Sequence, residues 1–426
     1  MIDMTKTRFF LIFPFALIIF LLVYLAGCQL NIVNEGPASL NTPGDISDEI
    51  SSTVEESPTE DFRLEKTPEM SDSYFTSNCV SIVGDMPSSS LMGELVIEPA
   101  DGSPTFLNDI STGGKIYIGN SVWPYIEASP TFSQLAFWDV DKHTLLVVSP
   151  EGEVQASIMP AEDEELAPMH WISESEILVE DDYINSGIFG DFDYLIWDLD
   201  ADTLSKLDFP IPTVDQAFDW FHEPLLIPNE SKTYLVHPTL SNDVVLLDLD
   251  SNEEIVTIYD AGLYSNSPIW SSDGKSFILG LPLRYKVDGE VLENFDDGLP
   301  YIGGAELFRI NIEGEFQRVT YLSTENKVNI WNLAWSPDET AIAFWLEFSD
   351  SSDDGMSLAF ANVDSGVTTD LCISGYDEIY WSPDGRYLAI NAARPNDPGS
   401  DVVLIDLELM EGYRIFERAY IVGILN

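Results

Sequence analysis

The chain has 426 residues, of which 45% are hydrophobic and 12% aromatic, so it carries ample material for a folded core. Its 74 acidic residues outnumber 18 basic ones, for a formal net charge of −56. This balance excludes nucleic acid as a partner, because binding phosphates needs clustered lysine and arginine. It favours a solvated acidic surface.

The N-terminal residues 1–27 have the pattern of an export signal. Lys6 and Arg8 precede an apolar run over residues 9–26, and the run ends in "LAGC", whose last residue is Cys28. Small residues that lead directly into a cysteine resemble a bacterial lipoprotein signal peptide. The resemblance implies cleavage before Cys28 and lipid attachment there. The alternative is an uncleaved transmembrane helix, since the run approaches the ~20 residues that span a bilayer.

Residues 28–75 are predicted to form a disordered tether. They are rich in serine, threonine, proline and acids, with almost no apolar periodicity. Such a segment cannot bury enough apolar surface to offset the entropy of ordering it. Like charges extend it. We therefore expect it to space a folded body from the outer side of the cell membrane.

Residues 76–426 repeat a phrase built around tryptophan. The clearest copies are "IWSSDGKSFIL" from Ile269, "LAWSPDETAIAF" from Leu333 and "IYWSPDGRYLAI" from Ile379. Each tryptophan is predicted to end one strand and to pack between neighbouring sheets. Ser-Pro-Asp-Gly is then predicted to form a tight turn into a second strand. A hairpin of alternating strands follows each copy, so the unit holds four antiparallel strands.

Four strands in ~40–45 residues predict one blade of a β-propeller. Residues 94–119 supply three strands of a further blade, and residues 419–426 supply its missing strand. We therefore expect an all-β propeller of seven four-stranded blades, closed by its N- and C-terminal strands, with six blades as the alternative. The six complete units cover residues 121–158, 166–209, 216–260, 266–322, 329–373 and 377–418.

The phrase resembles the TolB-type, WD-like repeats of bacterial exported β-propeller proteins. The residues that carry the resemblance are Trp270 to Gly274, Trp335 to Asp338 and Trp381 to Gly385, and it covers roughly residues 90–426. It implies the fold. It does not imply the partners of TolB, because the chain has no separate N-terminal α/β domain to match.

Three cysteines fit an exported protein. If Cys28 carries lipid, Cys79 and Cys372 remain. A disulfide between them is permitted outside the cytosol and would join the N-terminal segment to the main body. Two separately buried thiols are the alternative.

The long loops fall repeatedly between the second and third strands of a unit, so we expect the binding face there. Tyrosine and arginine are typical interface anchors. Ordinary loop decoration is the alternative interpretation. The candidate ligand- or partner-binding residues are Arg284, Tyr285, Tyr301, Tyr183, Phe189, Phe348 and Arg394.

The sequence predicts no metal site, no cofactor and no enzymatic activity. Acidic stretches at residues 198–202 and 248–252 begin like calcium loops, but Thr203 and Glu253 stand where such a loop needs glycine. No Gly-x-Ser-x-Gly motif is present. We expect a monomeric, lipid-anchored binding or scaffolding module at the cell surface, with a protein or saccharide partner. The alternatives are an enzyme that acts on a saccharide through channel carboxylates, and a purely structural envelope protein.

Overall fold

The structure of the chain is a computed structural model. The predicted export signal, Cys28 and nearly all of the predicted tether lie outside the residues that it describes. Those described fall within one structural unit, Phe62–Asn426. They are 74–84, 86, 93–120, 126–160, 166–181, 193–206, 227–228, 234–238, 243–251, 253–259, 261, 268–282, 286–287, 290–291, 304–324, 327–349, 356–394 and 399–426.

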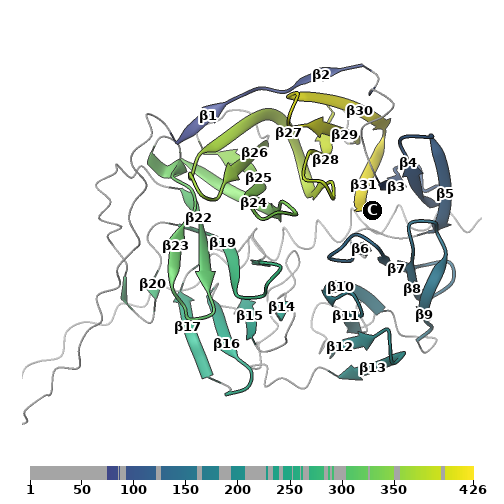
Figure 1. Ribbon diagram of the computed structural model, residues 1–426, viewed down its shortest axis with the longest axis horizontal. Helices are drawn as coiled ribbons and strands as arrows, with labels where there is room; N and C mark the ends of the chain where they lie inside the picture. Colours follow the sequence, from purple (N-terminus) through teal and green to yellow (C-terminus); the bar gives the residue numbers. More distant parts are fainter. Residues whose placement is uncertain are drawn as a thin grey trace, which may run out of the picture. The chain divides into compact units, whose positions relative to one another are not determined.

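The described residues form antiparallel sheets that follow one another along the chain (Figure 1). Sheet 1 contains β31 (Ala419–Leu425), β3 (Glu94–Pro99), β4 (Thr105–Asp109) and β5 (Gly114–Gly119). Sheet 2 contains β6 (Ile126–Ala128), β7 (Leu135–Asp139), β8 (Thr144–Val148) and β9 (Val154–Ile158). Sheet 3 contains β10 (Leu166–Ser173), β11 (Glu176–Asp181), β12 (Asp193–Asp198) and β13 (Thr203–Lys206).

The next two sheets are interleaved along the chain. Sheet 4 contains β14 (Ile227–Pro228), β15 (Tyr234–Pro238), β16 (Val244–Asp248), β17 (Glu253–Tyr259), β20 (Lys286–Val287) and β21 (Glu290–Val291). Sheet 5 contains β18 (Ile269–Trp270), β19 (Ser276–Pro282), β22 (Ala305–Asn311) and β23 (Phe316–Arg318). The insertion between β19 and β22 therefore adds a hairpin to the edge of the preceding sheet, through pairing of β20 with β17.

The C-terminal part of the chain forms a nine-stranded sheet with two successive four-stranded meanders. The 3₁₀ turn η3 (Leu322–Thr324) leads into it. The first meander is β24 (Val328–Trp335), β25 (Ala341–Phe348), β26 (Met356–Asn362) and the start of β27 (Thr368–Trp381). The second is the end of β27 with β28 (Tyr387–Ala393), β29 (Ser400–Asp406) and β30 (Glu411–Glu417). Within the described residues the secondary structure is thus all-β, as expected, apart from η3.

Alternation along the strands explains how the sheets pack on each other. In β3, Leu95 and Ile97 contact the second meander, whereas Val96 between them contacts sheet 2. In β29, Val402 and Val403 likewise belong to different cores. Successive side chains of a strand point to opposite faces. Because a neighbouring sheet covers each face of β3 and β29, these two strands read as continuous apolar runs.

Every described sheet shares an apolar core with the next one along the chain. Cores of this kind join sheets 1 and 2, 2 and 3, 3 and 4, 4 and 5, sheet 5 and the first meander, and the two meanders. A further core joins the second meander to sheet 1. The C-terminal β31 also pairs with β3 near the start of the body, as the sequence predicted.

The N-terminal end of the body forms a strap across the nine-stranded sheet. Strand β1 (Phe75–Ser77) pairs in parallel with β27, and β2 (Ser81–Val83) pairs in parallel with β30. Between these strands, Cys79 forms a disulfide with Cys372. Tyr74 is only 5% exposed and stacks on Tyr321 at 4.4 Å between ring centroids. Tyr74 is the first residue of the body that the structure describes.

The tryptophan phrase forms the turn that the sequence predicted. Ser382 Oγ donates to Asp384 Oδ1 at 2.6 Å, and Gly385 N donates to Ser382 O at 2.8 Å. Gly385 has φ of +71°, a conformation that costs glycine little. The same serine-to-aspartate bond recurs in the turns that begin at Ser271 and Ser336. The phrase is therefore a structural turn in its three clearest copies.

Among the described residues, no helix has the length and apolar character needed to cross a membrane.

Candidate functional site

In five of the four-stranded units, the first strand lies beside the first strand of a neighbouring unit. Strand β24 contacts β27, β27 contacts β31, β31 contacts β6, and β6 contacts β10 (Figure 1). We call these strands the inner strands. Their convergence brings side chains from distant parts of the sequence to one region, which makes it the natural place to look for a composite site.

Two inner strands carry bulges with unusual backbone geometry. In β24 the pairing shifts between Trp331 and Ala334, and Asn332 there has φ of +45°. In β27 the pairing shifts between Tyr376 and Ile379, around Asp377. A bulge re-aims side chains, and bulges are common beside functional sites.

Asp377 sits at the more pronounced of the two bulges. Its φ is +68°, a region that costs about 1 kcal/mol or more for a residue with a side chain. Trp345 Nε1 donates to Asp377 O at 2.7 Å and fixes the bulge. The Trp345 ring also packs closely against the bulge, since a Cβ added to Gly375 would lie only 2.5 Å from that ring. The surrounding structure therefore holds Asp377 and Glu378 in a defined position.

Carboxyl groups at this bulge have raised pKa values. Burial raises the pKa of Asp377 to about 6. Burial also raises the pKa of Glu378, and the neighbouring Asp377 charge raises it further. The Glu378 residue is nevertheless exposed to water. Within the described part of the chain, no lysine or arginine contributes to the pKa shift of either group.

Phenol groups from two inner strands accompany these carboxyl groups. Burial raises the pKa of Tyr380 well above its ordinary value, and the charges of Glu378, Glu127 and Asp377 raise it further. Burial likewise raises the pKa of Tyr376, with smaller contributions from Tyr420 and Asp377 against an opposing hydrogen bond from Ser400. The groups that influence one another define the inner-strand cluster, which consists of Glu127, Tyr376, Asp377, Glu378, Tyr380 and Tyr420.

His170 lies on the inner strand β10. Burial lowers its pKa to about 4, so the imidazole is neutral at pH 7 and brings no positive charge to the inner strands.

The inner-strand cluster is suited to ligands that donate hydrogen bonds or carry positive charge. Carboxylates accept hydrogen bonds, phenols both donate and accept, and an incoming cation would relieve the unfavourable charge that raises these pKa values. A metal ion has less support, because no group of three or more His, Cys, Asp or Glu side chains within the described ranges is arranged to hold one. Amines, guanidinium groups and hydroxyl groups are therefore the matching chemistry.

Only two of the predicted binding residues fall within the described part of the chain, and both make internal contacts. Phe348 packs edge-on against Phe75 of the strap, with 6.1 Å between ring centroids. Arg394 Nη1 contacts Asp401 Oδ1 at 2.8 Å. The structure thus gives these two residues packing and pairing roles. The residues that lie outside the described ranges are Arg284, Tyr285, Tyr301, Tyr183 and Phe189.

The two acidic stretches that begin like calcium loops are hairpin turns. Asp198 Oδ1 accepts a hydrogen bond from Ala201 N at 2.9 Å. Asp248 Oδ1 accepts from Asp250 N at 2.9 Å and from Ser251 N at 3.2 Å. In both turns the aspartate oxygen binds backbone amides of its own turn, which is the ordinary role of aspartate there.

One local sign of the inner-strand cluster is present in the sequence. Residues 376–378 read Tyr-Asp-Glu immediately before the apolar strand that leads to Trp381. Two adjacent acids there interrupt the alternation of that strand, and the interruption coincides with the bulge. The approach of Glu127 and Tyr420 to this point depends on the fold and had no local signal.

The arrangement of strands in this chain is similar to that in several solved structures. TolB from Acinetobacter baumannii matches with a TM-score of 0.40 and 11% identity, over 75% of this chain and 78% of that one. A putative TolB from Agrobacterium tumefaciens matches with a TM-score of 0.38 and 14% identity, over 70% and 96%. Hydrazine synthase from Kuenenia stuttgartiensis matches with a TM-score of 0.40 and 14% identity, over 69% and 80%. No family and no curated protein matches the sequence. These likenesses decide nothing about activity or partners.

Proposed function

We propose that the chain is an exported, lipid-anchored β-propeller of seven four-stranded blades that binds a protein partner at the cell surface. The seven blades are sheets 1 to 5 and the two meanders. The continuous succession of apolar cores supports closure, since the second meander shares a core with sheet 1. The pairing of β31 with β3 supports it further. In a closed ring, the pairing with β31 covers the edge of β3 that would otherwise be open to edge-to-edge aggregation.

The anchor is proposed to be lipid on Cys28, on the strength of "LAGC" after an apolar run. Two or more acyl chains hold a protein firmly at a membrane, whereas one chain binds only marginally. In the bacterium that makes the protein, Cys28→Ser is expected to move it from the detergent phase to the aqueous phase in a phase-separation assay. Cys79→Ser, which leaves Cys28 intact, is the control. Retention of the Cys28→Ser protein in the detergent phase would contradict lipid attachment.

Binding is proposed to occur at the inner-strand cluster, and one observation carries this proposal. The bulge of β27, a strand that contacts β31, carries the adjacent carboxyl groups of Asp377 and Glu378 beside Tyr376. Among the described residues, no cationic side chain contributes to the raised pKa values of these two carboxyl groups. A basic segment of a protein partner would supply the missing positive charge. We further propose that the chain is a monomer. We also propose that it is not an enzyme, because its sequence lacks the motifs of nucleophilic and metal-dependent catalysis.

A charge-matched pair of variants tests the site. The probe is an unlabelled Ala-Lys-Ala-Arg-Ala-Lys peptide, titrated by calorimetry at 0.15 M salt into the protein without its export signal. Asp377→Asn with Glu378→Gln is expected to weaken binding about tenfold, as the loss of charged hydrogen bonds implies. Glu151→Gln with Glu153→Gln removes the same charge at an exposed turn and is expected to have little effect. Binding should also weaken below pH 6, because Asp377 becomes protonated.

Equal weakening by both pairs would show that the peptide follows net charge alone, and would contradict the site. Parallel titrations with maltotriose and chitotriose test whether the site binds saccharides instead. A saccharide that binds in place of the peptide, and is cleaved, would favour the alternative of an enzyme over a binding module.

A further inference from the structure

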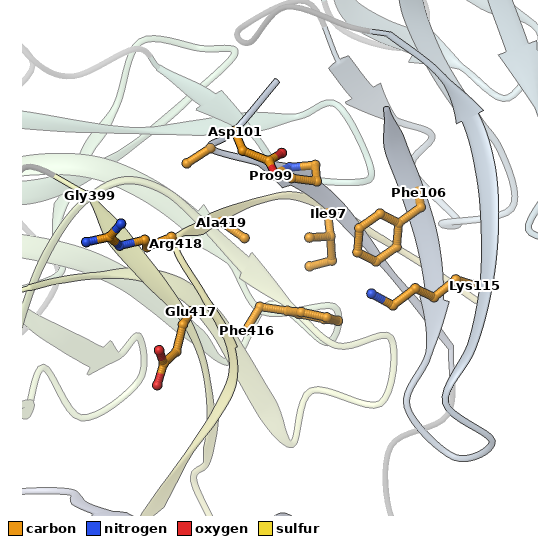
Figure 2. Close-up of a pocket in the computed structure, with 11 residues that line it drawn as sticks. Ile97, Pro99, Asp101, Phe106, Lys115, Gly399, Phe416, Glu417, Arg418 and Ala419 are labelled. Atoms are coloured by element: carbon orange, nitrogen blue, oxygen red, sulfur yellow. The ribbon is translucent and has the colours of Figure 1, made fainter. Parts of the chain in front are cut away.

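A hollow lies where sheet 1 meets the second meander (Figure 2). Its volume is about 610 Å³, within the roughly 300–1,000 Å³ of small-molecule sites. The wall is largely apolar, with Ile97, Phe106, Phe416 and Ala419 among its lining residues. It can therefore take the apolar body of a ligand.

Two cationic side chains, Lys115 and Arg418, line the hollow, and Lys115 lies beside its aromatic rings (Figure 2). The ammonium group of Lys115 lies 4.1 Å from the centroid of the Phe106 ring and 4.9 Å from that of Phe416 (Figure 2). The two rings are themselves packed edge-on, 5.6 Å apart. The cation–π attraction of both rings holds the charge in place.

The ammonium group of Lys115 retains its hydrogen-bonding capacity. Among the described residues no carboxylate lies within 4.0 Å of Lys115 Nζ. Aromatic faces offer no lone pair to its three N–H donors. This is unusual in a chain with 74 acidic and 18 basic residues, where a lysine has many opportunities to pair. An anion at the hollow would meet a positioned and unneutralised positive charge.

The acidic residues around the hollow restrict the position of such an anion. Asp101 and Glu417 also line it, on the side away from Lys115 (Figure 2). Asp101 Oδ1 is occupied by Ser103 N at 2.9 Å. A negative charge beside Lys115 lies apart from these carboxylates, and Arg418 adds a second positive charge on their side of the hollow (Figure 2).

We propose that this hollow binds a carboxylate with an apolar body, with the carboxylate on Lys115 Nζ and the body against Phe106 and Phe416. The proposal does not depend on the function proposed for the inner-strand cluster, because none of the cluster's six residues is among those that line the hollow. The same chemistry is presented by a free aromatic acid and by a peptide that ends in a large apolar residue.

The test compares ligands that differ in charge alone. Calorimetric titration uses 1-naphthaleneacetate, its neutral amide and 1-naphthalenemethylamine, with the wild-type protein at 0.15 M salt. The acid is expected to bind about tenfold more tightly than the amide, and the amine more weakly than either. Gly-Gly-Phe and its C-terminal amide are titrated in the same way to test a peptide as the ligand. The ligand type with the larger ratio of acid affinity to amide affinity, free aromatic acid or peptide, is then identified as the source of the carboxylate.

Variants assign the preference to Lys115. Lys115→Met is expected to lose the preference for the acid, and Lys115→Arg to keep most of it. Lys275→Met, which removes an exposed lysine paired with Asp273, is the matched control and should bind as wild type does. Asp377→Asn should also leave this binding unchanged.

Equal affinity for acid and amide in the wild-type protein would overturn the proposal without any variant. A Lys115→Met protein that keeps its preference would overturn it too. A Lys115→Met protein with unchanged affinities for all the ligands and a lower thermal midpoint would also overturn the proposal. Lys115 would then only join the two sheets.

Discussion

At the scale of single residues, the repeated tryptophans join neighbouring units through their indole N–H groups. Trp381 Nε1 donates to Ala334 O at 3.0 Å, and Trp171 Nε1 donates to Glu127 O at 2.9 Å. Trp335 Nε1 makes the equivalent contact with Ile269 O at 3.4 Å. Each acceptor lies on the first strand of the preceding unit. The tryptophan thus places both an apolar ring and a directed donor between units.

Replacing Trp381 by phenylalanine tests the value of this donor. Trp381 is 4% exposed, and its loss leaves a carbonyl without its partner and part of the ring volume empty. We expect Trp381→Phe to lower the free energy of unfolding by about 1–3 kcal/mol, measured by urea denaturation. Trp335→Phe is the control, with a smaller loss, because its bond is longer and its ring less buried. A larger loss for Trp335→Phe would contradict a role for the indole donor.

The sequence predicted the position of the tryptophans but not the direction of their hydrogen bonds. The turn residues Ser382, Asp384 and Gly385 act within five residues of one another, so their roles follow from local chemistry. The bond from Trp381 to Ala334 spans two units, and its register is set by how the units stack. Long-range register of this kind leaves no local trace in the sequence.

At the scale of elements, strand alternation allowed most sheets to be placed. Strands such as β3 and β29 bury both faces, and their apolar residues identified them directly. The strands of the strap were missed, since β1 and β2 have three residues each and only the edges of β27 and β30 to pair with. Segments this short, beside an acidic stretch, have no periodicity to detect.

The strap also explains why the number of cysteines did not decide whether Cys79 and Cys372 form a disulfide or remain separate thiols. Cys79 and Cys372 are separated by 293 positions in the sequence, and nothing near either residue indicates the other. They meet because β1 lies parallel to β27, with Phe75 opposite Thr368. Cys372 itself has φ of +57°, a further feature set by the strand around it. The pairing is therefore a consequence of the fold.

At the scale of the whole molecule, the body depends on a strand contributed from the far end of the chain. Strand β31 pairs with β3 along six residue pairs, from Glu94 with Leu425 to Pro99 with Ala419. Its buried side chains divide between two cores, Ile421 and Ile424 toward the second meander and Val422 toward sheet 2. Asn426 N also donates to Phe132 O at 2.7 Å, in the turn of sheet 2. Removal of β31 would therefore affect three units at once.

Deleting residues 419–426 tests closure. The deletion exposes β3 as a long apolar edge with Leu95, Val96 and Ile97, which are fully buried in the intact body. Such an edge recruits other strands, so the truncated protein should lose its cooperative thermal transition and form oligomers, as measured by light scattering. A synthetic peptide with the sequence AYIVGILN, added during refolding, should restore a monomer by supplying the missing strand. The same peptide with Ile421→Lys and Ile424→Lys is the control and should not restore it. A truncated protein that stays monomeric, with an unchanged thermal midpoint, would show that the body holds together without β31 and would remove the basis for a closed ring.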